Sequence, residues 1–331
     1  MGSIGQLLDR TLDLTVAPGY TAVGYRLRGL RWEQAIAGDF ARGRVALVTG
    51  ASSGLGEATC EGLAEAGARV HMVVRDRNRG EAARERIAGR LAGSGIDPQL
   101  ELELCDISRP TAVSEFAAGF AARAPELAVL VNNAGVLPAK RQRTVEGHEL
   151  TFATNALGPF VLTNSLLPAL RAAGRARVIT VTSGGMYTSR LDADDPELDR
   201  RDYDGPAFYA HTKRVEVVLT QLWAEREPQG GVEFFAVHPG WVDTPGLAAS
   251  LPRFRSLLRP VLRDTRAGAD TTVWLATADR PGVGSGDLVH DRRPRPRHRL
   301  RRTTETAAER ERLWDELERR SAGAAAAKNV R

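Results

Sequence analysis

Residues 45–56 read Val45-Ala46-Leu47-Val48-Thr49-Gly50-Ala51-Ser52-Ser53-Gly54-Leu55-Gly56. The first five residues predict a buried strand, and Ala58, Leu63 and Ala64 predict an amphipathic helix after the turn. The glycines between them follow the spacing G-x-x-x-G-x-G, a variant of the dinucleotide-binding fingerprint. Because glycine permits the turn and lets the backbone approach a pyrophosphate at the helix N-terminus, the stretch predicts a nucleotide site.

Strands and helices alternate along the rest of the chain. Further strands are predicted at residues 69–74, 100–104, 127–131, 177–182, 232–237 and 288–290, and helices at residues 81–92, 110–122, 150–170, 208–226 and 267–276. This alternation predicts an α/β fold, a Rossmann-type doubly wound parallel sheet with right-handed crossovers. We expect a single domain at residues 44–291, between an N-terminal leader (residues 1–43) and a C-terminal extension (residues 292–331) that contains a helix.

The composition of the 331 residues is ordinary for a soluble globular protein, with 42% hydrophobic and 26% charged residues. The two cysteines, Cys60 and Cys105, exclude a disulfide framework and a four-cysteine metal site. Both lie beside apolar runs, so we expect them to be buried, and the chain suits a reducing, cytoplasmic compartment. No apolar run reaches the length of a membrane span, and the N-terminus lacks the pattern of a secretory signal.

The leader contains a candidate apolar helix face with arginines around it. The apolar residues are Val23, Leu27, Leu30, Trp32, Ile36 and Phe40. Two interpretations stay open: residues 23–40 contact a membrane surface as an interfacial helix, or they form an extra helix packed on the domain. We prefer the packed helix.

An arginine-rich segment, residues 292–302, precedes the last predicted helix at residues 304–320. The segment holds seven arginines, and the prolines among them argue against a helix there. It has no interleaved aromatic residues and no recognition motif, so we expect no nucleic-acid partner. The last helix carries Leu313, Trp314 and Leu317 on one side, which predicts that it packs on the core.

Tyr209 and Lys213 are a candidate acid–base pair. Their spacing puts both side chains on one face of a helix, about one turn apart. A phenol is a poor acid at neutral pH, but an ammonium beside it lowers its pKa and makes proton transfer to a substrate oxygen feasible. Of the 46 basic residues, three are lysines (Lys140, Lys213, Lys328) and 43 are arginines. A lysine at position 213 therefore indicates a role that a guanidinium does not fill, although a solvated helix face is the alternative.

The predicted strand at residues 69–74 ends in Arg75 and Asp76. At this place an acidic residue would bind the ribose of NAD, and an arginine the 2′-phosphate of NADP. Because Arg75 comes first, we favour NADP, with NAD and a simple solvated helix start as alternatives. Asp106 ends the next strand and is placed to meet an adenine edge, and residues 132–135 border the ligand crevice of an open parallel sheet.

Two other polar features have an ordinary interpretation. Asn155 lies inside a predicted helix, where an asparagine usually faces solvent or bonds to its own backbone. Seven acidic residues gather between positions 192 and 204 with irregular spacing and without a histidine. We expect a solvated loop there and no metal site.

These motifs, in this order, resemble the short-chain dehydrogenase/reductase family. The resemblance covers roughly residues 44–290. The residues that carry it are the turn at 49–56, Asn132-Asn133-Ala134-Gly135, Asn155, Ser183, Tyr209, Lys213 and Pro239-Gly240. The 26-residue step from Ser183 to Tyr209 resembles the retinol-dehydrogenase-like branch. A still closer resemblance, to the dehydrogenase/reductase member twelve group, rests on residues 182–186, 238–246 and 291–294.

The resemblance implies four catalytic residues. Tyr209 would be the general acid or base, Lys213 would lower its pKa and hold the nicotinamide ribose, Ser183 would bind the substrate oxygen, and Asn155 would hold a proton-relaying water. The expected cofactor-binding residues are Gly50, Ser52, Ser53, Gly54, Leu55, Gly56, Arg75, Asp106, Ile107, Asn132, Ala134, Gly135, Tyr209, Lys213, Pro239, Gly240, Val242 and Thr244. The family commonly pairs through the helices bearing Asn155 and Tyr209, so a homo-oligomer is expected unless the extra segments block it.

The leading hypothesis is an NADP-preferring oxidoreductase that acts on a carbonyl or alcohol of an apolar small molecule. The apolar substrate is suggested by the leucine-rich cover segment (residues 245–262). The alternative is a catalytically idle NADP-binding protein that acts through partners. A nucleic-acid-associated protein that uses the arginines of residues 292–302 is a third, weaker hypothesis.

Overall fold

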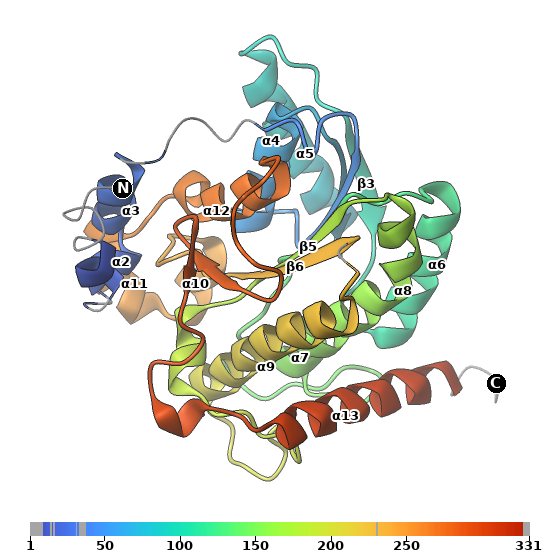
Figure 1. Cartoon of the computed structure of the whole chain (residues 1–331), viewed down its shortest axis with the longest axis vertical. Coiled ribbons are helices and arrows are strands. Elements are labelled where there is room, and N and C mark those ends of the chain that lie inside the picture. Colours follow the sequence, from blue (N-terminus) through green and yellow to red (C-terminus); the bar gives the residue numbers. More distant parts are fainter. Residues whose placement is uncertain are drawn as a thin grey trace.

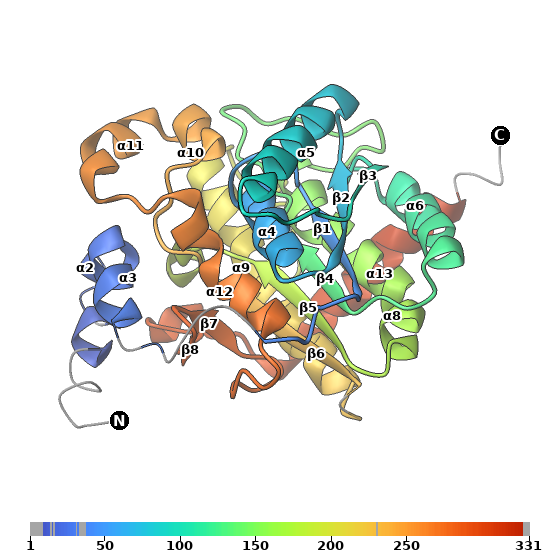
Figure 2. The same ribbon diagram turned by 90° about the horizontal axis from the view of Figure 1, so that it is seen from above.

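One sheet of eight strands forms the centre of the part of the chain that this computed structural model describes, residues 9–13, 15, 17–30, 32, 38–229 and 231–326. The strands lie in the order β3-β2-β1-β4-β5-β6-β7-β8 (Figures 1 and 2). They are β1 (Val45–Thr49), β2 (Arg69–Val74), β3 (Leu100–Leu104), β4 (Val129–Asn132), β5 (Ala176–Val181), β6 (Val232–Val237), β7 (Leu288–His290) and β8 (Arg293–Arg295). The first seven are parallel, and β8 pairs antiparallel with β7. The order reverses between β1 and β4, which is where open α/β sheets bind ligands.

Helices cover both faces of the sheet, which confirms the doubly wound prediction. One layer contains α4 (Gly54–Glu65), α5 (Arg77–Ala92) and α12 (Thr265–Thr277), and the other contains α6 (Pro110–Arg123), α8 (Gly158–Ala172) and α9 (Gly205–Arg226). Successive strand residues point to opposite faces, so Val45 and Leu47 join one apolar cluster while Ala46 and Val48 join the other. The central strands are therefore apolar throughout, as buried parallel strands are.

The predicted strands at residues 69–74, 100–104, 232–237 and 288–290 coincide with β2, β3, β6 and β7. The helix predicted from residue 81 begins at Arg77, because the Asp76 carboxylate accepts a hydrogen bond from the Arg79 backbone N–H at 2.9 Å and caps it. Strand β8 was missed, because its arginines and proline lack any strand pattern. Its place at the edge of the sheet tolerates the proline.

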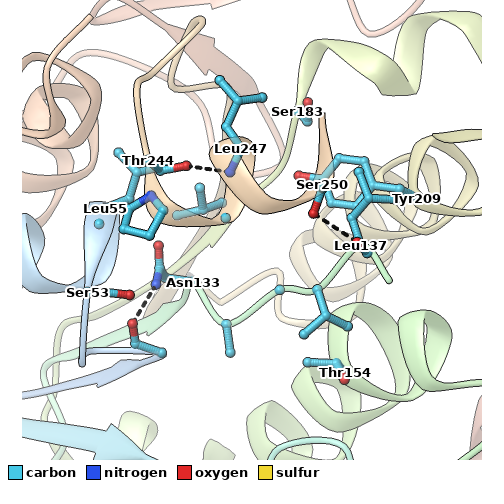
Figure 3. A pocket seen from close by; sticks show the side chains of 18 of the residues that line it. Ser53, Leu55, Asn133, Leu137, Thr154, Ser183, Tyr209, Thr244, Leu247 and Ser250 are labelled. Atoms are coloured by element: carbon cyan, nitrogen blue, oxygen red, sulfur yellow. Dashed lines mark hydrogen bonds between the residues drawn. The ribbon is translucent and has the colours of Figure 1, made fainter. Parts of the chain in front are cut away.

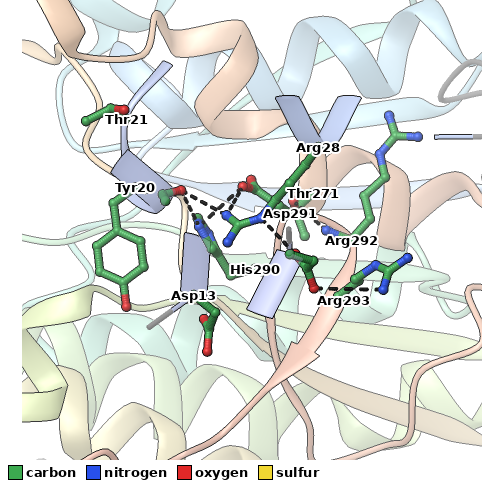
Figure 4. Close-up of polar contacts among 12 residues, drawn as sticks. Asp13, Tyr20, Thr21, Arg28, Thr271, His290, Asp291, Arg292 and Arg293 are labelled. Atoms are coloured by element: carbon green, nitrogen blue, oxygen red, sulfur yellow. Dashed lines mark hydrogen bonds and ion pairs between the residues drawn. The ribbon is translucent and has the colours of Figure 1, made fainter. Parts of the chain in front are cut away.

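The leader is packed on the body by a buried arginine. Residues 9–13 are helical, and α2 (Ala17–Tyr20) and α3 (Ala22–Gly29) follow, so the helix that carries Val23 and Leu27 ends at Gly29 and its apolar face does not continue to residue 40 as predicted. Leu30 is 82% exposed, whereas Arg28 is only 6% exposed because its Nη1 pairs with Asp291 at 2.7 Å (Figure 4). Ile36 lies outside the described residues. Contact of residues 23–40 with a membrane stays a prediction.

The arginine-rich segment is built into the fold. It contributes β8 and the short 3₁₀ helix η4 (Arg301–Thr303), and several of its guanidinium groups form ion pairs with carboxylates. The pairs are Arg292–Asp270 at 2.7 Å, Arg295–Asp9 at 2.8 Å and Arg299–Asp13 at 2.8 Å. Two of the three carboxylates belong to the leader, so the segment fastens the leader to the end of the sheet.

The terminal helix α13 (Ala307–Ala326) lies against α6 and α9 (Figure 1). Leu313, Trp314 and Leu317 join the core cluster on that side, which confirms the predicted packing. The helix contacts the elements that carry Asn155 and Tyr209, through which pairing was expected. Oligomerisation through them stays a prediction. No helix among the described residues has the length and apolar character that crossing a bilayer requires.

The acidic stretch between positions 192 and 204 is solvated only in part: Asp194, Asp199, Asp202 and Asp204 are exposed, as expected. Asp195 and Glu197 are buried. Asp195 accepts hydrogen bonds from backbone N–H groups of its own loop, and Glu197 accepts one from the Glu149 N–H at 2.6 Å and contacts His148 Nδ1 at 2.9 Å. Backbone amides and a histidine distant in sequence thus offset the burial of these carboxylates. Local sequence spacing gave no sign of either partner.

Candidate active site

A cavity of about 920 Å³ opens at the carboxyl ends of the central strands (Figure 3). Most of the predicted site residues line it. They are Gly50, Ser52, Ser53, Gly54, Leu55, Arg75, Asp106, Ile107, Ala134, Gly135, Ser183, Tyr209, Lys213, Pro239, Gly240, Val242 and Thr244. Three predicted residues, Gly56, Asn132 and Asn155, lie behind the wall instead. The structure therefore places most of the predicted residues in the wall and the other three behind it.

The glycine-rich turn has a conformation that only glycine adopts easily. Gly50 and Gly54 have φ values of +68° and +60°. Gly56 is needed for space rather than for φ, since a Cβ there would lie 2.2 Å from the Gly50 carbonyl oxygen. The turn leaves the N-terminus of α4 open to the cavity, which fits a pyrophosphate.

Asn133 lies in the segment that was predicted to border the ligand crevice, and it organises this edge of the cavity. Its side chain donates to the Thr49 carbonyl at 2.8 Å, and its backbone N–H donates to Thr49 Oγ1 at 3.0 Å. Asn132, by contrast, points inward and donates to Thr163 Oγ1 at 3.0 Å. The two adjacent asparagines thus have different roles. Asn133 connects β1 to β4 beside the cavity, and Asn132 connects β4 to α8.

Asn155 is buried in a π-helical turn, η1 (Ala153–Leu157), between α7 (Leu150–Phe152) and α8. Its Oδ1 accepts from the Val136 N–H at 2.9 Å, and its Nδ2 donates to Thr212 Oγ1 at 3.0 Å. The expectation of a solvent-facing or self-bonded asparagine is therefore wrong. The side chain joins the loop after β4 to α9, and π-turns of this kind are frequent at functional sites.

Tyr209 and Lys213 both face the cavity from α9, as the four-residue spacing predicted. Lys213 Nζ lies 5.3 Å from the centre of the Tyr209 ring. Ser183 stands across from them at the end of β5, where it caps the 3₁₀ turn η2 (Gly184–Thr188). One hydroxyl, one phenol and one ammonium thus converge on a single space.

Lys213 is 3% exposed and has two hydrogen-bond acceptors. Its Nζ donates to the Val181 carbonyl at 3.0 Å and to Glu216 Oε1 at 2.6 Å. Burial alone would lower the pKa of Lys213, but the charges of Glu216 and Tyr209 outweigh it and leave that pKa raised. Lys213 is therefore a stable cation in the neutral range.

Glu216 was missed by sequence reasoning. It lies within the apolar run of residues 215–219 and three residues after Lys213, and both features were signals in the sequence. Burial raises the pKa of Glu216 to about 7, against the opposing effect of Lys213. The carboxylate does not line the cavity, so it acts on the site through Lys213.

The far end of the cavity is basic. Arg75, Asp76 and Arg79 line it and are exposed. The Asp76 carboxylate is engaged in capping α5. Among the described residues, no carboxylate forms an ion pair with the guanidinium of Arg75 or Arg79, although most arginines of this chain have such a partner. Two uncompensated cations beside the second strand suit an anion.

The near end of the cavity is apolar. Its wall includes the side chains of Leu137, Leu150, Trp241, Leu247, Leu251 and Phe254. The cover segment forms it with α10 (Pro245–Ser250), α11 (Pro252–Leu258) and the 3₁₀ turn η3 (Arg259–Val261), in which no residue is fully buried. Ser250 Oγ donates to the Leu137 carbonyl at 2.8 Å (Figure 3), and the Arg255 guanidinium pairs with Asp243 at 2.6 Å. The cover is held by few contacts, which suits a segment that admits a ligand.

Comparison with known proteins gives consistent results. The family model of the short chain dehydrogenases matches residues 44–191. The chain is 44% identical over 278 residues to "Dehydrogenase/reductase SDR family member 12" of Bos taurus, which covers 83% of this chain and 86% of that protein. It is 34% identical over 283 residues to retinol dehydrogenase 12 of Homo sapiens, covering 82% and 84%.

A solved structure shares the architecture. A protein from Beutenbergia cavernae, assigned as an NAD(P) dependent gluconate 5-dehydrogenase and holding NADP, superposes with a TM-score of 0.60 at 26% identity. The match covers 77% of this chain and 97% of that one. The resemblances inferred from the motifs, to the family and to its two branches, are confirmed by these relatives.

Proposed function

The chain belongs to the short-chain dehydrogenase/reductase family and is an NAD(P)-dependent oxidoreductase of CH–OH or C=O groups; we propose that it prefers NADP and acts on an apolar small molecule. The observation that carries the proposal is the asymmetry of the cavity, which is basic at one end and apolar at the other. The convergent hydroxyl, phenol and ammonium lie between the two ends. No observation favours the catalytically idle alternative.

The preference for NADP rests on the basic end. A 2′-phosphate needs cationic partners, and within the described part of the chain no carboxylate forms an ion pair with Arg75 or Arg79. The Asp76 carboxylate, which would otherwise bind the ribose of NAD, instead accepts a hydrogen bond at the N-terminus of α5. Ser52 and Ser53 line the same end and add hydroxyl donors.

The residues of the wall fit a nicotinamide dinucleotide. A Cβ at Gly135 would lie 3.6 Å from Lys213 Nζ and 3.5 Å from Asn155 Oδ1, so glycine leaves the approach to the ammonium open for a ribose. The turn at residues 50–56 would hold the phosphates, and Asp106 and Ile107 the adenine. The bound nicotinamide supplies or accepts the hydride.

In the reducing direction, the Tyr209 phenol donates its proton to the substrate oxygen. Ser183 donates a hydrogen bond to the same oxygen, where negative charge develops. The Lys213 ammonium stabilises the phenolate that Tyr209 becomes. Asn155 braces the loop that borders the ammonium and so keeps a path for water to replace the proton. Oxidation reverses these roles.

The proposal of an apolar substrate rests on the apolar end of the cavity. Leucine and aromatic side chains provide area for an apolar body, and the cover segment provides a movable wall. Polar groups there are few, so discrimination among substrates would come from shape. Cytoplasmic location and pairing through α9 remain part of the same proposal.

The cofactor test compares NADPH with NADH at saturating substrate. We expect NADPH to be preferred, and Arg75→Ser to raise its KM about tenfold while leaving that of NADH unchanged, because one charge-assisted phosphate contact is lost. Arg77→Ser is the matched control, since Arg77 lies two residues away and faces Glu81 at 3.9 Å. Equal use of both cofactors by the native protein would reject the NADP preference.

The substrate test follows NADPH oxidation with lipophilic aldehydes, ketones and quinones, set against small polar ketones. We expect kcat/KM to rise with apolar area. Replacing Phe254 by Ala should lower kcat/KM for the largest substrates and leave the smallest unaffected, because Phe254 lines only the apolar end. Faster turnover of small polar ketones would reject the apolar substrate.

A further inference from the structure

Glu216 and Lys213 form a buried pair of opposite charges on one face of α9. Both side chains are 3% exposed, and Nζ lies 2.6 Å from Oε1. The second carboxylate oxygen, Oε2, is buried without a hydrogen-bond partner. Burying a carboxylate in this way costs free energy, so its presence beside the lysine needs a reason beyond stability.

The surroundings of Glu216 leave Lys213 as its one charged partner. On the side of β5, the Thr182 hydroxyl is the polar group that acts on it, and that hydroxyl donates to the Lys213 carbonyl at 2.8 Å. Asn155 and Thr212, on the η1 side, are neutral. Within the described part of the chain, no charged group from β6, η2, α7 or α13 acts on the carboxylate.

The pair therefore presents a different charge to the cavity than a lone lysine would. With Glu216 ionised, its negative charge offsets much of the positive charge of Lys213 at the distance of the Tyr209 ring. A phenol releases its proton less readily beside a cation that is paired with a carboxylate than beside an unpaired cation. The Val181 carbonyl and Glu216 together also fix where Nζ stands.

We propose that Glu216 is a positioning residue of the catalytic pair, which holds the Lys213 ammonium and offsets its charge so that Tyr209 stays protonated to higher pH. The inference rests on the proposed roles of Tyr209 and Lys213. It implies that the reduction, which needs the phenol, stays active to higher pH. The oxidation, which needs the phenolate, then also requires a higher pH.

The test is the pH profile of kcat/KM in both directions for the wild type and Glu216→Gln. Glutamine keeps the size and a hydrogen-bond acceptor but removes the charge. We expect the midpoints of both profiles to move down by about one pH unit. Asp270→Asn is the matched control, because it removes another buried carboxylate from an ion pair, with Arg292, outside the cavity wall. It should leave both midpoints in place.

A titration without cofactor separates this inference from the proposed function. Ultraviolet absorbance of tyrosinate is recorded against pH, and the curve of Tyr209→Phe is subtracted to isolate Tyr209. Burial raises the pKa of each of the four other tyrosines (Tyr20, Tyr25, Tyr187, Tyr203). In the Glu216→Gln background, the isolated curve should shift down by the same amount as the rate profile.

The outcomes are distinct. A shift in the titration without turnover of any substrate overturns the proposed function and supports the charge coupling. Turnover with unshifted profiles overturns the inference. If Glu216→Gln does not fold, Glu216→Asp replaces it, since the retracted carboxylate weakens the contact with Lys213 and should shift both measurements in the same direction by less. An unshifted Glu216→Asp then overturns the inference.

Discussion

Two buried clusters of charge in this molecule look alike in composition and differ in what they border. The first is the pair of Lys213 and Glu216, whose ammonium lines the cavity. The second surrounds Asp291, after β7, with Arg28 and Arg263 (Figure 4). None of these three residues lines the cavity.

The Asp291 cluster joins segments far apart in the chain. Its Oδ1 pairs with Arg263 Nη1 at 2.6 Å, and its Oδ2 pairs with Arg28 Nη1 at 2.7 Å. His290 Nε2 lies 3.3 Å from the same Oδ2. Burial would raise the pKa of Asp291, but the charges of His290, Arg263 and Arg28 outweigh it and leave that pKa lowered. One anion is thus enclosed by cations from α3 and from the loop before α12.

The difference teaches how to interpret a buried charge. Where both carboxylate oxygens are occupied and no cavity is adjacent, the charges fasten elements together. Where an ammonium has one carboxylate behind it and open space in front, the charges are available for chemistry. The first cluster should therefore govern activity, and the second should govern stability.

The largest expected effect is on the functional cluster. Tyr209→Phe should lower kcat about 10²- to 10⁴-fold, because the proton donor to the substrate oxygen is removed. Binding of NADPH, followed by its fluorescence, and the midpoint of thermal unfolding should change little. Tyr25→Phe also deletes one hydroxyl, but on α3, and should leave kcat unchanged. If Tyr209→Phe lost stability but kept its turnover, the assignment of this cluster to activity rather than to stability would be wrong.

The opposite effect is expected at the structural cluster. Asp291→Asn should lower the free energy of unfolding by about 3–5 kcal/mol, because it removes the carboxylate that the buried Arg263 pairs with and leaves Arg28 with Asp9 alone. Denaturant unfolding measures this, and kcat below the transition should stay close to that of the wild type. Asp39→Asn, which breaks an exposed pair with Arg42, should cost at most about 1 kcal/mol. A native-like Asp291→Asn contradicts the structural role.

Acidification should weaken the fold through two buried histidines. Burial lowers the pKa of His211 and of His290 to about 4. In the unfolded chain a histidine titrates near pH 6.5. Between pH 6.5 and 4 the unfolded state therefore binds more protons than the folded state, and the free energy of unfolding decreases as the pH is lowered. Each histidine contributes about 3 kcal/mol to this loss. The unfolding midpoint measured from pH 7 to 4 should fall steadily, and less steeply in His211→Asn, whose side chain can still accept from the Asp192 N–H.

How much of the fold could be predicted follows from which contacts are local. Strands β2, β3, β6 and β7 were predicted at their observed bounds, because period and apolar content act within a few residues. Strand β8 and the burial of Glu197 were not predicted. Strand β8 pairs with β7, its neighbour in the chain, but its arginines and proline carry no strand pattern. The burial of Glu197 depends on His148, which is distant in the chain.

The candidate site divides in the same way. Tyr209 and Lys213 share one helix turn, so their juxtaposition follows from spacing alone. Asn155 was misjudged as solvent-facing because its partners, the loop after β4 and Thr212, meet it only in the folded chain. Glu216 went unnoticed although it lies three residues after Lys213, a spacing that also brings side chains together on a helix. The spacing does not show that the pair is buried.

The smallest expected effect concerns the leader, and it tests whether the Asp291 cluster fastens it. Arg28→Met should destabilise the leader by about 2 kcal/mol, since the guanidinium also donates to Asp9 at 2.9 Å and to the Gly19 carbonyl at 2.9 Å. Amides of α2 and α3 should then exchange faster with solvent while those of the central strands keep their protection, because Arg263 still pairs with Asp291. Arg26→Met, on the exposed side of α3, should alter neither. Unchanged exchange in Arg28→Met would show that the apolar contacts of Tyr20, rather than the charges, hold the leader in place.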